Sequence, residues 1–132
     1  MTHSILVAEN DVACRNRLDG FFQRHGFRTY TTSCGTEAIE IVQKVPIEMG
    51  VLDMFLPDAS AVEILGVMRR LRGAVPTVII VENDSKETRM KALSAGAYTV
   101  IRKSLLDIVI EQTIRDMMRK FFGEIANPEE SF

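Results

Sequence analysis

Five short strand-like runs, each followed by a stretch with helical spacing, constrain the fold of this chain more than any other feature. The runs are residues 5–8, 27–31, 49–52, 77–81 and 98–101. Runs that are apolar throughout, such as residues 5–8 and 77–81, are typical of strands buried on both faces. The stretches that follow them are residues 12–25, 36–44, 60–72, 85–95 and 105–122. The sequence therefore predicts five strands that alternate with five helices.

Alternating strands and helices form right-handed βαβ units, which give a parallel sheet covered by helices on both faces. The second strand, residues 27–31, mixes charged and polar residues and is typical of an edge strand. We therefore expect the strand order 2-1-3-4-5 of a flavodoxin-like α/β fold, a three-layer (βα)5 sandwich. A chain of 132 residues has the size of one domain, which we assign to residues 1–122. Residues 123–132 contain Pro128 and three glutamates and are expected to fray.

The composition excludes several classes of protein. A net charge of −2 argues against a nucleic-acid binder, which is usually basic. No apolar run approaches the length that spans a membrane, and the first residues lack the pattern of a secretory signal. The two cysteines, Cys14 and Cys34, are too few for a disulfide framework. We expect a cytoplasmic protein that contacts neither nucleic acid nor membrane.

Polar side chains gather where the predicted strands end. They are Glu9 and Asn10 after the first strand, Asp53 after the third, Glu82, Asn83 and Asp84 after the fourth, and Lys103 after the fifth. Parallel strands bring their carboxyl ends to one edge of the sheet, where ligands bind beside the point at which the strand order reverses. Asp11 and Asp84 directly precede helices and are expected to cap them. Asp53 lies too far from the helix at residues 60–72 to cap it, which favours a functional role.

The chemistry of this edge favours phosphoryl transfer. Its loops carry no glycine-rich segment to hold the phosphate of a cofactor, which argues against a flavin or dinucleotide site. Carboxylate oxygens are the ligands that Mg²⁺ prefers. A carboxylate beside Mg²⁺ can act as the nucleophile toward a phosphoryl donor, and a lysine can neutralise the phosphoryl oxygens. Mg²⁺, Asp53 and Lys103 together would make a phosphoryl-acceptor set.

Several segments resemble the receiver domain of response regulators in two-component signalling. They read ILVAEND (5–11), VLDMFLPD (51–58), PTVIIV (76–81), ALSAGA (92–97) and RKS (102–104). Their order and spacing carry the resemblance, which extends from residue 5 to about residue 118. The resemblance implies that Asp53 is the phosphorylated residue and that Lys103 contacts the phosphoryl group. It also implies a Mg²⁺ ion, here weakly bound, that is held by Glu9, Asn10, Asp53 and the carbonyl of Phe55.

Other positions depart from the pattern of that family. Asn10 is neutral where a second acid is usual, which weakens the attraction for Mg²⁺. Val81 stands at the position of the switch serine or threonine and lacks a hydroxyl to bond a phosphoryl oxygen. Val100 stands at the position of the aromatic switch residue. Glu82 replaces a small residue and is expected to shield Asp53 or to repel a phosphoryl group.

The loop after Lys103 departs from the family as well, because Ser104 stands where the family has proline. A cis bond before a residue other than proline costs roughly 3 kcal/mol, so we expect a trans peptide between Lys103 and Ser104. Ser104 and Asp107 have the spacing of a capping box, which we expect at the start of the last helix.

The sequence predicts a receiver domain that takes a phosphoryl group on Asp53 from a histidine kinase or phosphotransfer protein, a signalling module rather than a metabolic enzyme. A homodimer or output-protein contact is expected through the fourth helix, the fifth strand and the fifth helix. The alternative is a pseudo-receiver that binds a partner regardless of phosphorylation. Asn10, Val81 and Val100 favour that alternative, whereas Asp53 and Lys103 oppose it. A flavin-binding electron carrier is disfavoured by the absence of tryptophan and of a phosphate-binding loop.

Overall fold

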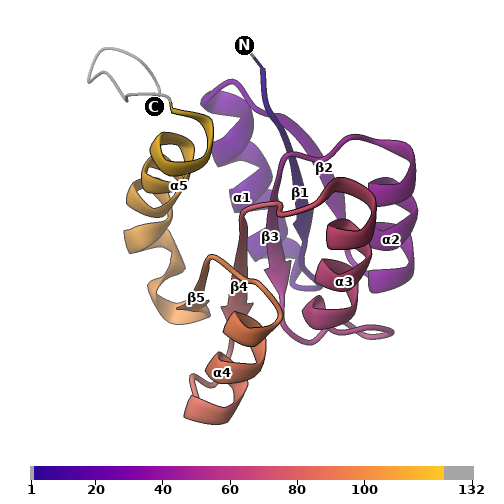
Figure 1. Ribbon diagram of the computed structural model, residues 1–132. Helices are drawn as coiled ribbons and strands as arrows, with labels where there is room; N and C mark the ends of the chain where they lie inside the picture. The colour runs from indigo at the N-terminus through magenta and orange to yellow at the C-terminus, as the bar shows by residue number, and fades with distance from the viewer. Residues whose placement is uncertain (1, 124–132) are drawn as a thin grey trace.

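A computed structural model describes residues 2–123 of the chain (Figure 1). Five strands form one parallel sheet in the order β2-β1-β3-β4-β5, which confirms the predicted topology. The strands are β1 (Ser4–Ala8), β2 (Arg28–Thr32), β3 (Met49–Asp53), β4 (Thr77–Val81) and β5 (Thr99–Arg102). The helices are α1 (Val12–Arg24), α2 (Gly35–Lys44), α3 (Ala61–Arg72), α4 (Lys86–Ser94) and α5 (Leu106–Phe122), with a short 3₁₀ turn, η1 (Lys103–Leu105), before α5.

Helices cover both faces of the sheet, and the sheet separates the hydrophobic core into two layers. α1 and α5 lie on one face, and α2, α3 and α4 lie on the other (Figure 1). Side chains alternate along the strands, so that Ile5 and Val7 pack with α1 and α5 while Leu6 and Ala8 belong to the opposite layer. β4 is buried along its whole length, as suits an interior strand. β2 is exposed or half-buried at all but its last position, which confirms it as an edge strand.

Short polar side chains fix where three helices begin. Asp11 caps α1, because its Oδ1 accepts a hydrogen bond from the third backbone N–H of the helix, and this prediction is confirmed. Ser60 and Ser85 cap α3 and α4, so each of these helices begins one residue later than the sequence predicts. The prediction that Asp84 caps α4 is wrong, because Ser85 takes that position. Asp84 instead forms an ion pair with Arg89, at 2.6 Å.

The chain turns tightly between β5 and α5. Lys103–Leu105 form the 3₁₀ turn, and α5 begins after Leu105, which makes no side-chain capping hydrogen bond. The predicted capping box of Ser104 and Asp107 is therefore wrong, since Ser104 lies inside the turn rather than at the start of the helix. No cis peptide bond occurs within residues 2–123, so the peptide that joins Lys103 to Ser104 is trans, as predicted.

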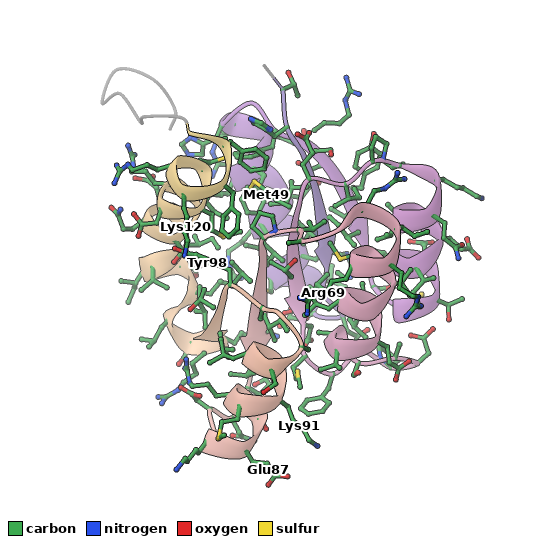
Figure 2. The ribbon with its side chains drawn as sticks, in the orientation of Figure 1. Met49, Arg69, Glu87, Lys91, Tyr98 and Lys120 are labelled. Carbon is green, nitrogen blue, oxygen red and sulfur yellow. The ribbon has the colours of Figure 1, made fainter. Side chains whose placement is uncertain are left out.

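Few side chains anchor α4 to the sheet. Ala92 is the one buried residue of this helix, and Glu87 and Lys91 project from it into solvent (Figure 2). Arg69 of α3 braces its far end, because Nη1 of Arg69 donates a hydrogen bond to the carbonyl of Ala95 at 3.2 Å. The buried side chain of Ala92 and the hydrogen bond from Arg69 thus hold α4 against the rest of the domain.

α5 ends at Gly123, whose φ of 67° lies in the left-handed region that glycine adopts without strain. Near that end, Nζ of Lys120 lies 5.5 Å from the ring centroid of Tyr98 (Figure 2). The predicted fraying of the tail concerns residues 123–132, of which residues 124–132 lie outside the described residues. Within the part of the chain that the structure describes, no helix has both the length and the apolar character needed to cross a membrane.

Candidate functional site

Asp53 and Glu9 meet at the carboxyl edge of the sheet, at the ends of the paired strands β3 and β1. Asp53 is the last residue of β3, which runs one residue further than predicted, and it is half-buried. Glu9 follows β1 directly and is fully buried. Its backbone N–H donates a hydrogen bond to the carbonyl of Thr32 at 3.0 Å, which continues the pairing with β2. The two carboxyl groups lie close enough for each to shift the pKa of the other.

This pairing shifts the pKa of both carboxyl groups. Burial, the hydrogen bond with Glu9 and the negative charge of Glu9 raise the pKa of Asp53 to about 7. Burial opposes the charge of Glu9 as well, but hydrogen bonds with Asp53 and Cys14 and the charge of Lys103 hold the pKa of Glu9 below its usual value. Of the two, Glu9 is the stronger acid and Asp53 the group whose carboxyl holds a proton more readily. Burial and the charge of Glu9 raise the pKa of the Cys14 thiol to about 12, so this thiol stays neutral.

Lys103 faces three carboxylates across the same edge. Its Nζ lies 3.4 Å from Oε1 of Glu9, 3.0 Å from Oδ2 of Asp11 and 3.3 Å from Oε1 of Glu82. Burial opposes the charge of Lys103, but the contacts with Asp11, Glu9 and Glu82 raise the pKa of its amine above the usual value. Among residues 2–123, Lys103 makes no ion pair with Asp53.

The structure brings together only some of the polar residues that the sequence places at this edge. Glu82 turns its carboxylate to Lys103, at 3.3 Å. Asp84 turns to Arg89 instead and takes no part in the cluster. Asn10 is exposed, and its backbone carbonyl, rather than its side chain, accepts a hydrogen bond from Arg15. The residues that converge are Glu9, Asp53, Glu82 and Lys103.

Asp11 is a member of this cluster that the sequence analysis missed, since it assigned Asp11 a capping role alone. One oxygen, Oδ1, caps α1, and the other, Oδ2, lies 3.0 Å from the ammonium group of Lys103. A capping residue that follows the first strand within three positions lies at the same edge of the sheet as the strand ends. That position is the signal by which the second role of Asp11 could have been found.

The loop between β3 and α3 presents the carbonyl of Phe55. The N–H of Phe55 donates a hydrogen bond to Oδ1 of Asp53 at 3.2 Å, and an isolated bridge joins Phe55 to Ser60. The Phe55 side chain is 68% exposed. Further along, Oδ1 of Asp58 accepts a hydrogen bond from the N–H of Gly35 at 2.6 Å, which ties the loop to α2. These contacts restrain the backbone from both sides.

The oxygen donors at this edge fit Mg²⁺. Oε1 of Glu9 is buried and accepts no hydrogen bond within the described residues, although it lies in ion-pair range of Lys103. A buried carboxylate oxygen in that condition is costly unless a cation satisfies it. No group of three or more His, Cys, Asp or Glu side chains within residues 2–123 could hold a metal ion by itself. Glu9 and Asp53 would therefore need the amide of Asn10 and the carbonyl of Phe55, a mixed oxygen set that Mg²⁺ accepts.

The two residues that the sequence analysis places at the switch positions are buried valines. Val81 ends β4 and is 2% exposed, and Val100 lies in β5 and is 4% exposed. Both belong to the core layer beneath α2, α3 and α4. Neither side chain has a hydrogen-bond donor, and Val100 already packs in the core, so it has no exposed position from which to turn inward.

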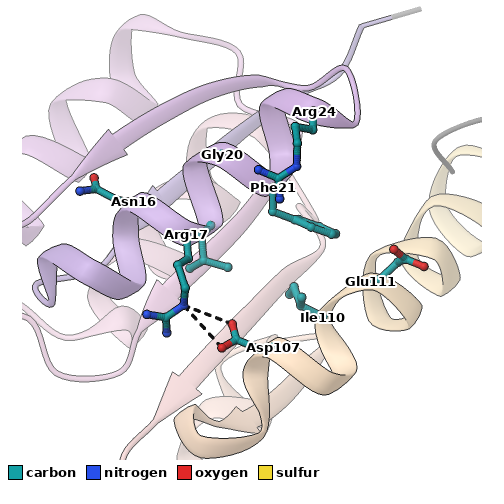
Figure 3. A pocket seen from close by; sticks show the side chains of 9 residues that line it. Asn16, Arg17, Gly20, Phe21, Arg24, Asp107, Ile110 and Glu111 are labelled. Atoms are coloured by element: carbon teal, nitrogen blue, oxygen red, sulfur yellow. Dashed lines mark hydrogen bonds and ion pairs between the residues drawn. The ribbon is translucent and has the colours of Figure 1, made fainter.

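A separate groove of about 310 Å³ lies between α1 and α5 (Figure 3). Arg17 and Asp107 bridge it, with Nε of Arg17 3.5 Å from the Asp107 carboxylate, and Phe21 and Ile110 supply apolar surface. None of Glu9, Asp53, Glu82 and Lys103, the residues that converge at the carboxyl edge of the sheet, lines this groove. The carboxyl edge of the sheet therefore remains the candidate site.

The fold and this edge define the class of protein. A sequence profile of the response regulator receiver domain matches residues 5–115. The chain therefore belongs to the response regulator receiver domain family, whose members are signalling modules of two-component systems.

Individual relatives agree with this assignment. The chain is 27% identical over 93 residues to the cell cycle transcriptional regulator CtrA of Caulobacter vibrioides, an alignment of 70% of this chain and 40% of that protein. It is 26% identical over 127 residues to sporulation initiation phosphotransferase F of Bacillus subtilis, with 96% of this chain and 99% of that protein aligned. The chain thus spans less than half of CtrA and nearly all of the Bacillus protein.

Solved structures show the same fold. A CheY-like response regulator receiver domain protein from Methanospirillum hungatei superposes with a TM-score of 0.84 at 19% identity, over 91% of this chain and 96% of that one. The BeF3-activated receiver domain of DrrB superposes with a TM-score of 0.79 at 22% identity, over 90% of this chain and all of that one.

Proposed function

We propose that this receiver domain accepts a phosphoryl group on Asp53 from a histidine kinase or a phosphotransfer protein. One observation carries the proposal: Asp53 ends β3 half-buried against Glu9, and Lys103 pairs with that same Glu9. A nucleophilic carboxylate, a metal-binding acid and a restrained ammonium group are the parts that this reaction needs. The near-complete alignment with sporulation initiation phosphotransferase F supports a place in a phosphorelay in the cytoplasm.

In the proposed step, an oxygen of Asp53 attacks the phosphorus atom of the donor. An O–P bond forms while the bond between phosphorus and the donor's histidine nitrogen breaks, and the electron pair leaves with the imidazole. Asp53 attacks as the carboxylate, so its raised pKa works against the step at low pH. Glu9, Asn10, Asp53 and the carbonyl of Phe55 would hold Mg²⁺, which neutralises charge on the phosphoryl oxygens when it is bound. Lys103 would donate a hydrogen bond to one of those oxygens.

The test is incubation of the protein with Mg²⁺ and a small phosphodonor such as acetyl phosphate, followed by measurement of the intact mass. We expect one added phosphoryl group on the wild-type protein and none on Asp53→Asn, whose amide is not a nucleophile. The matched control is Asp84→Asn, which removes an acid from the same edge that pairs with Arg89 outside the cluster. This control should be modified like wild type. Wild-type protein that stays unmodified would contradict the proposal.

A pseudo-receiver that binds a partner regardless of phosphorylation is the second candidate. Val81 and Val100 favour it, because neither can carry a switch to the surface formed by α4, β5 and α5. A second copy or an output protein would then bind that surface with the same affinity in every phosphorylation state. Equal sedimentation behaviour of wild type and Asp53→Asn, with and without the phosphodonor, is expected for this candidate. A change in sedimentation on phosphorylation would rule it out.

A further inference from the structure

Glu82 and Lys103 are neighbours because of the sheet register. Val81, the last residue of β4, pairs with Arg102, the last residue of β5. Glu82 directly follows β4 and Lys103 directly follows β5, so the two residues are neighbours at the end of the sheet. Nζ of Lys103 lies 3.3 Å from Oε1 of Glu82. The Glu82 side chain is 74% exposed, whereas that of Lys103 is 19% exposed. A short contact thus joins an exposed acid on the surface to a largely buried lysine inside the site.

The ammonium group of Lys103 has three hydrogen-bond donors and no more. Three carboxylates lie within 3.0 to 3.4 Å of it: Glu9, Asp11 and Glu82. The contact with Glu82 is a hydrogen bond, whereas Oε1 of Glu9 lies in ion-pair range and accepts none. Among residues 2–123 these three carboxylates, and not Asp53, are the ion-pair partners of Lys103, so Lys103 has to move away from at least one of them to contact a phosphoryl group on Asp53.

We propose that Glu82 is the carboxylate that Lys103 releases, and that Glu82 is a positioning residue which withholds Lys103 from Asp53 and slows phosphoryl transfer. The inference rests on the proposed function of Asp53. Glu9 is fully buried, so its carboxylate has no solvent to turn into. Asp11 is held by its second role as the cap of α1. Glu82 has no such restraint and can rotate into solvent.

The first measurement tests the contact between Lys103 and Glu82. A small amine-reactive reagent labels neutral lysine amines, and peptide mass spectrometry gives the labelling rate of Lys103 relative to the exposed Lys86 and Lys91. Loss of the Glu82 carboxylate removes the hydrogen bond that holds the Lys103 amine and leaves the amine more accessible to the reagent. We expect its relative labelling rate to rise about two- to five-fold in Glu82→Gln and at least as much in Glu82→Ala, as suits one exposed ion pair.

The second measurement is the rate at which the phosphodonor modifies Asp53 in the presence of Mg²⁺. We expect both Glu82 variants to be modified faster than wild type, by a similar two- to five-fold factor. The matched control is Asp84→Asn, which removes the same charge from the same loop but not from Lys103. It should leave both rates at the wild-type values.

The outcomes separate this inference from the proposed function. Unchanged labelling of Lys103 in both Glu82 variants overturns the inference. Increased labelling with an unchanged or slower modification of Asp53 overturns it as well. Lys103 would then be released from Glu82 without any gain in the rate of phosphoryl transfer. Increased labelling with no modification in any protein, wild type included, upholds the restraint on Lys103 and refutes the phosphoacceptor role of Asp53. Acceleration of both rates in Asp84→Asn would show a general charge effect and would also overturn the inference.

Discussion

The carboxylate of Asp58 caps α2 from a loop that follows 23 residues later in the chain, with its Oδ1 2.6 Å from the backbone nitrogen of Gly35. Its Oδ2 accepts hydrogen bonds from the backbone N–H and the hydroxyl of Thr36. Cys34, the residue at the N-cap position of α2, makes no side-chain capping bond of its own. The loop that carries Phe55 is therefore fastened to the start of α2, and this fastening requires the two backbones to come close together.

Gly35→Ala should break that close approach. A Cβ at Gly35 would lie 2.3 Å from the Cβ of Ala59, a distance that forces backbone to move. We expect a loss of about 1–3 kcal/mol in the free energy of unfolding, measured by urea denaturation.

The matched control is Gly66→Ala, in the middle of α3. A Cβ at Gly66 would meet only the flexible end of Arg70, at 3.6 Å. Because alanine is the better helix former, this variant should gain about 0.5–1 kcal/mol. If both variants shift stability in the same direction, the close contact between Gly35 and Ala59 is not what sets the cost.

The raised pKa of Asp53 should make stability depend on pH. A carboxyl whose pKa is raised by folding contributes stability that is fully present below its unfolded pKa and is lost as the pH rises through the folded value, here about 7. The lowered pKa of Glu9 acts in the opposite direction, but only near and below its ordinary value of 4.5. Stability should therefore fall between about pH 4 and pH 7. The fall should be on the order of 1–2 kcal/mol, because water screens the half-exposed Asp53 and reduces the full effect.

The variant Asp53→Asn tests this cause. It should be more stable than wild type at about pH 8 and nearly equal to it at about pH 4, where Asp53 is largely protonated in the folded wild type and about half protonated in the unfolded chain. Urea denaturation at constant ionic strength measures both. Stability profiles that run parallel from about pH 4 to pH 8 would show that the Asp53 carboxyl is not the titrating group.

The fold could be predicted because its signals are local. The apolar run of β4 and the helical spacing of α2 or α5 are each contained in one stretch of sequence, and the topology follows from their alternation. Helix starts were less certain where two good capping residues stand side by side. Asp84 and Ser85 are such a pair, and the contact of Asp84 with Arg89 leaves the cap to Ser85.

The sequence predicts which residues meet at the site better than it predicts which of them contact one another. Strand order alone brings the ends of β1, β3, β4 and β5 together, so the meeting of Glu9, Asp53 and Lys103 could be inferred. Which carboxylates Lys103 contacts depends on the 3₁₀ turn after β5 and on side-chain rotamers, and neither leaves a pattern in the sequence. The reach of Asp58 to α2 is likewise a tertiary contact without a local signal.

Asn10→Asp should strengthen Mg²⁺ binding. Asn10 is exposed at the carboxyl edge beside the buried Glu9, and its amide offers an oxygen without a full charge. A unit charge at contact range is worth on the order of 1–4 kcal/mol before solvation is counted, so we expect an increase in affinity of about tenfold. Direct calorimetric titration of both proteins at one ionic strength measures it. Equal dissociation constants would mean that Asn10 lies outside the metal site.

The switch positions predict a phosphorylated state that hardly differs from the unmodified one at α4. A ligand shifts a conformational equilibrium only through its differential interaction with the two states. Val81 cannot donate a hydrogen bond to a phosphoryl oxygen, which removes a charge-assisted bond of about 1.5–3 kcal/mol from that difference. Val100 is buried, with only 4% of its surface exposed, so it has no exposed conformation from which it could turn inward. We expect phosphorylation, or a phosphate mimic at Asp53, to perturb the loops after β3 and β4 only.

Amide hydrogen exchange read by mass spectrometry measures this. α4 is a sensitive reporter, because Ala92 is its one buried residue and any coupled movement should change the protection of residues 86–95. Exchange in residues 86–95 and 98–115 should stay near its unmodified rate while exchange beside Asp53 slows. Val81→Thr restores the missing donor with nearly the same side-chain shape, so in this variant the response of α4 should grow. A strong response of α4 in the wild-type protein would mean that phosphorylation reaches this helix by a route that does not need a hydroxyl at position 81.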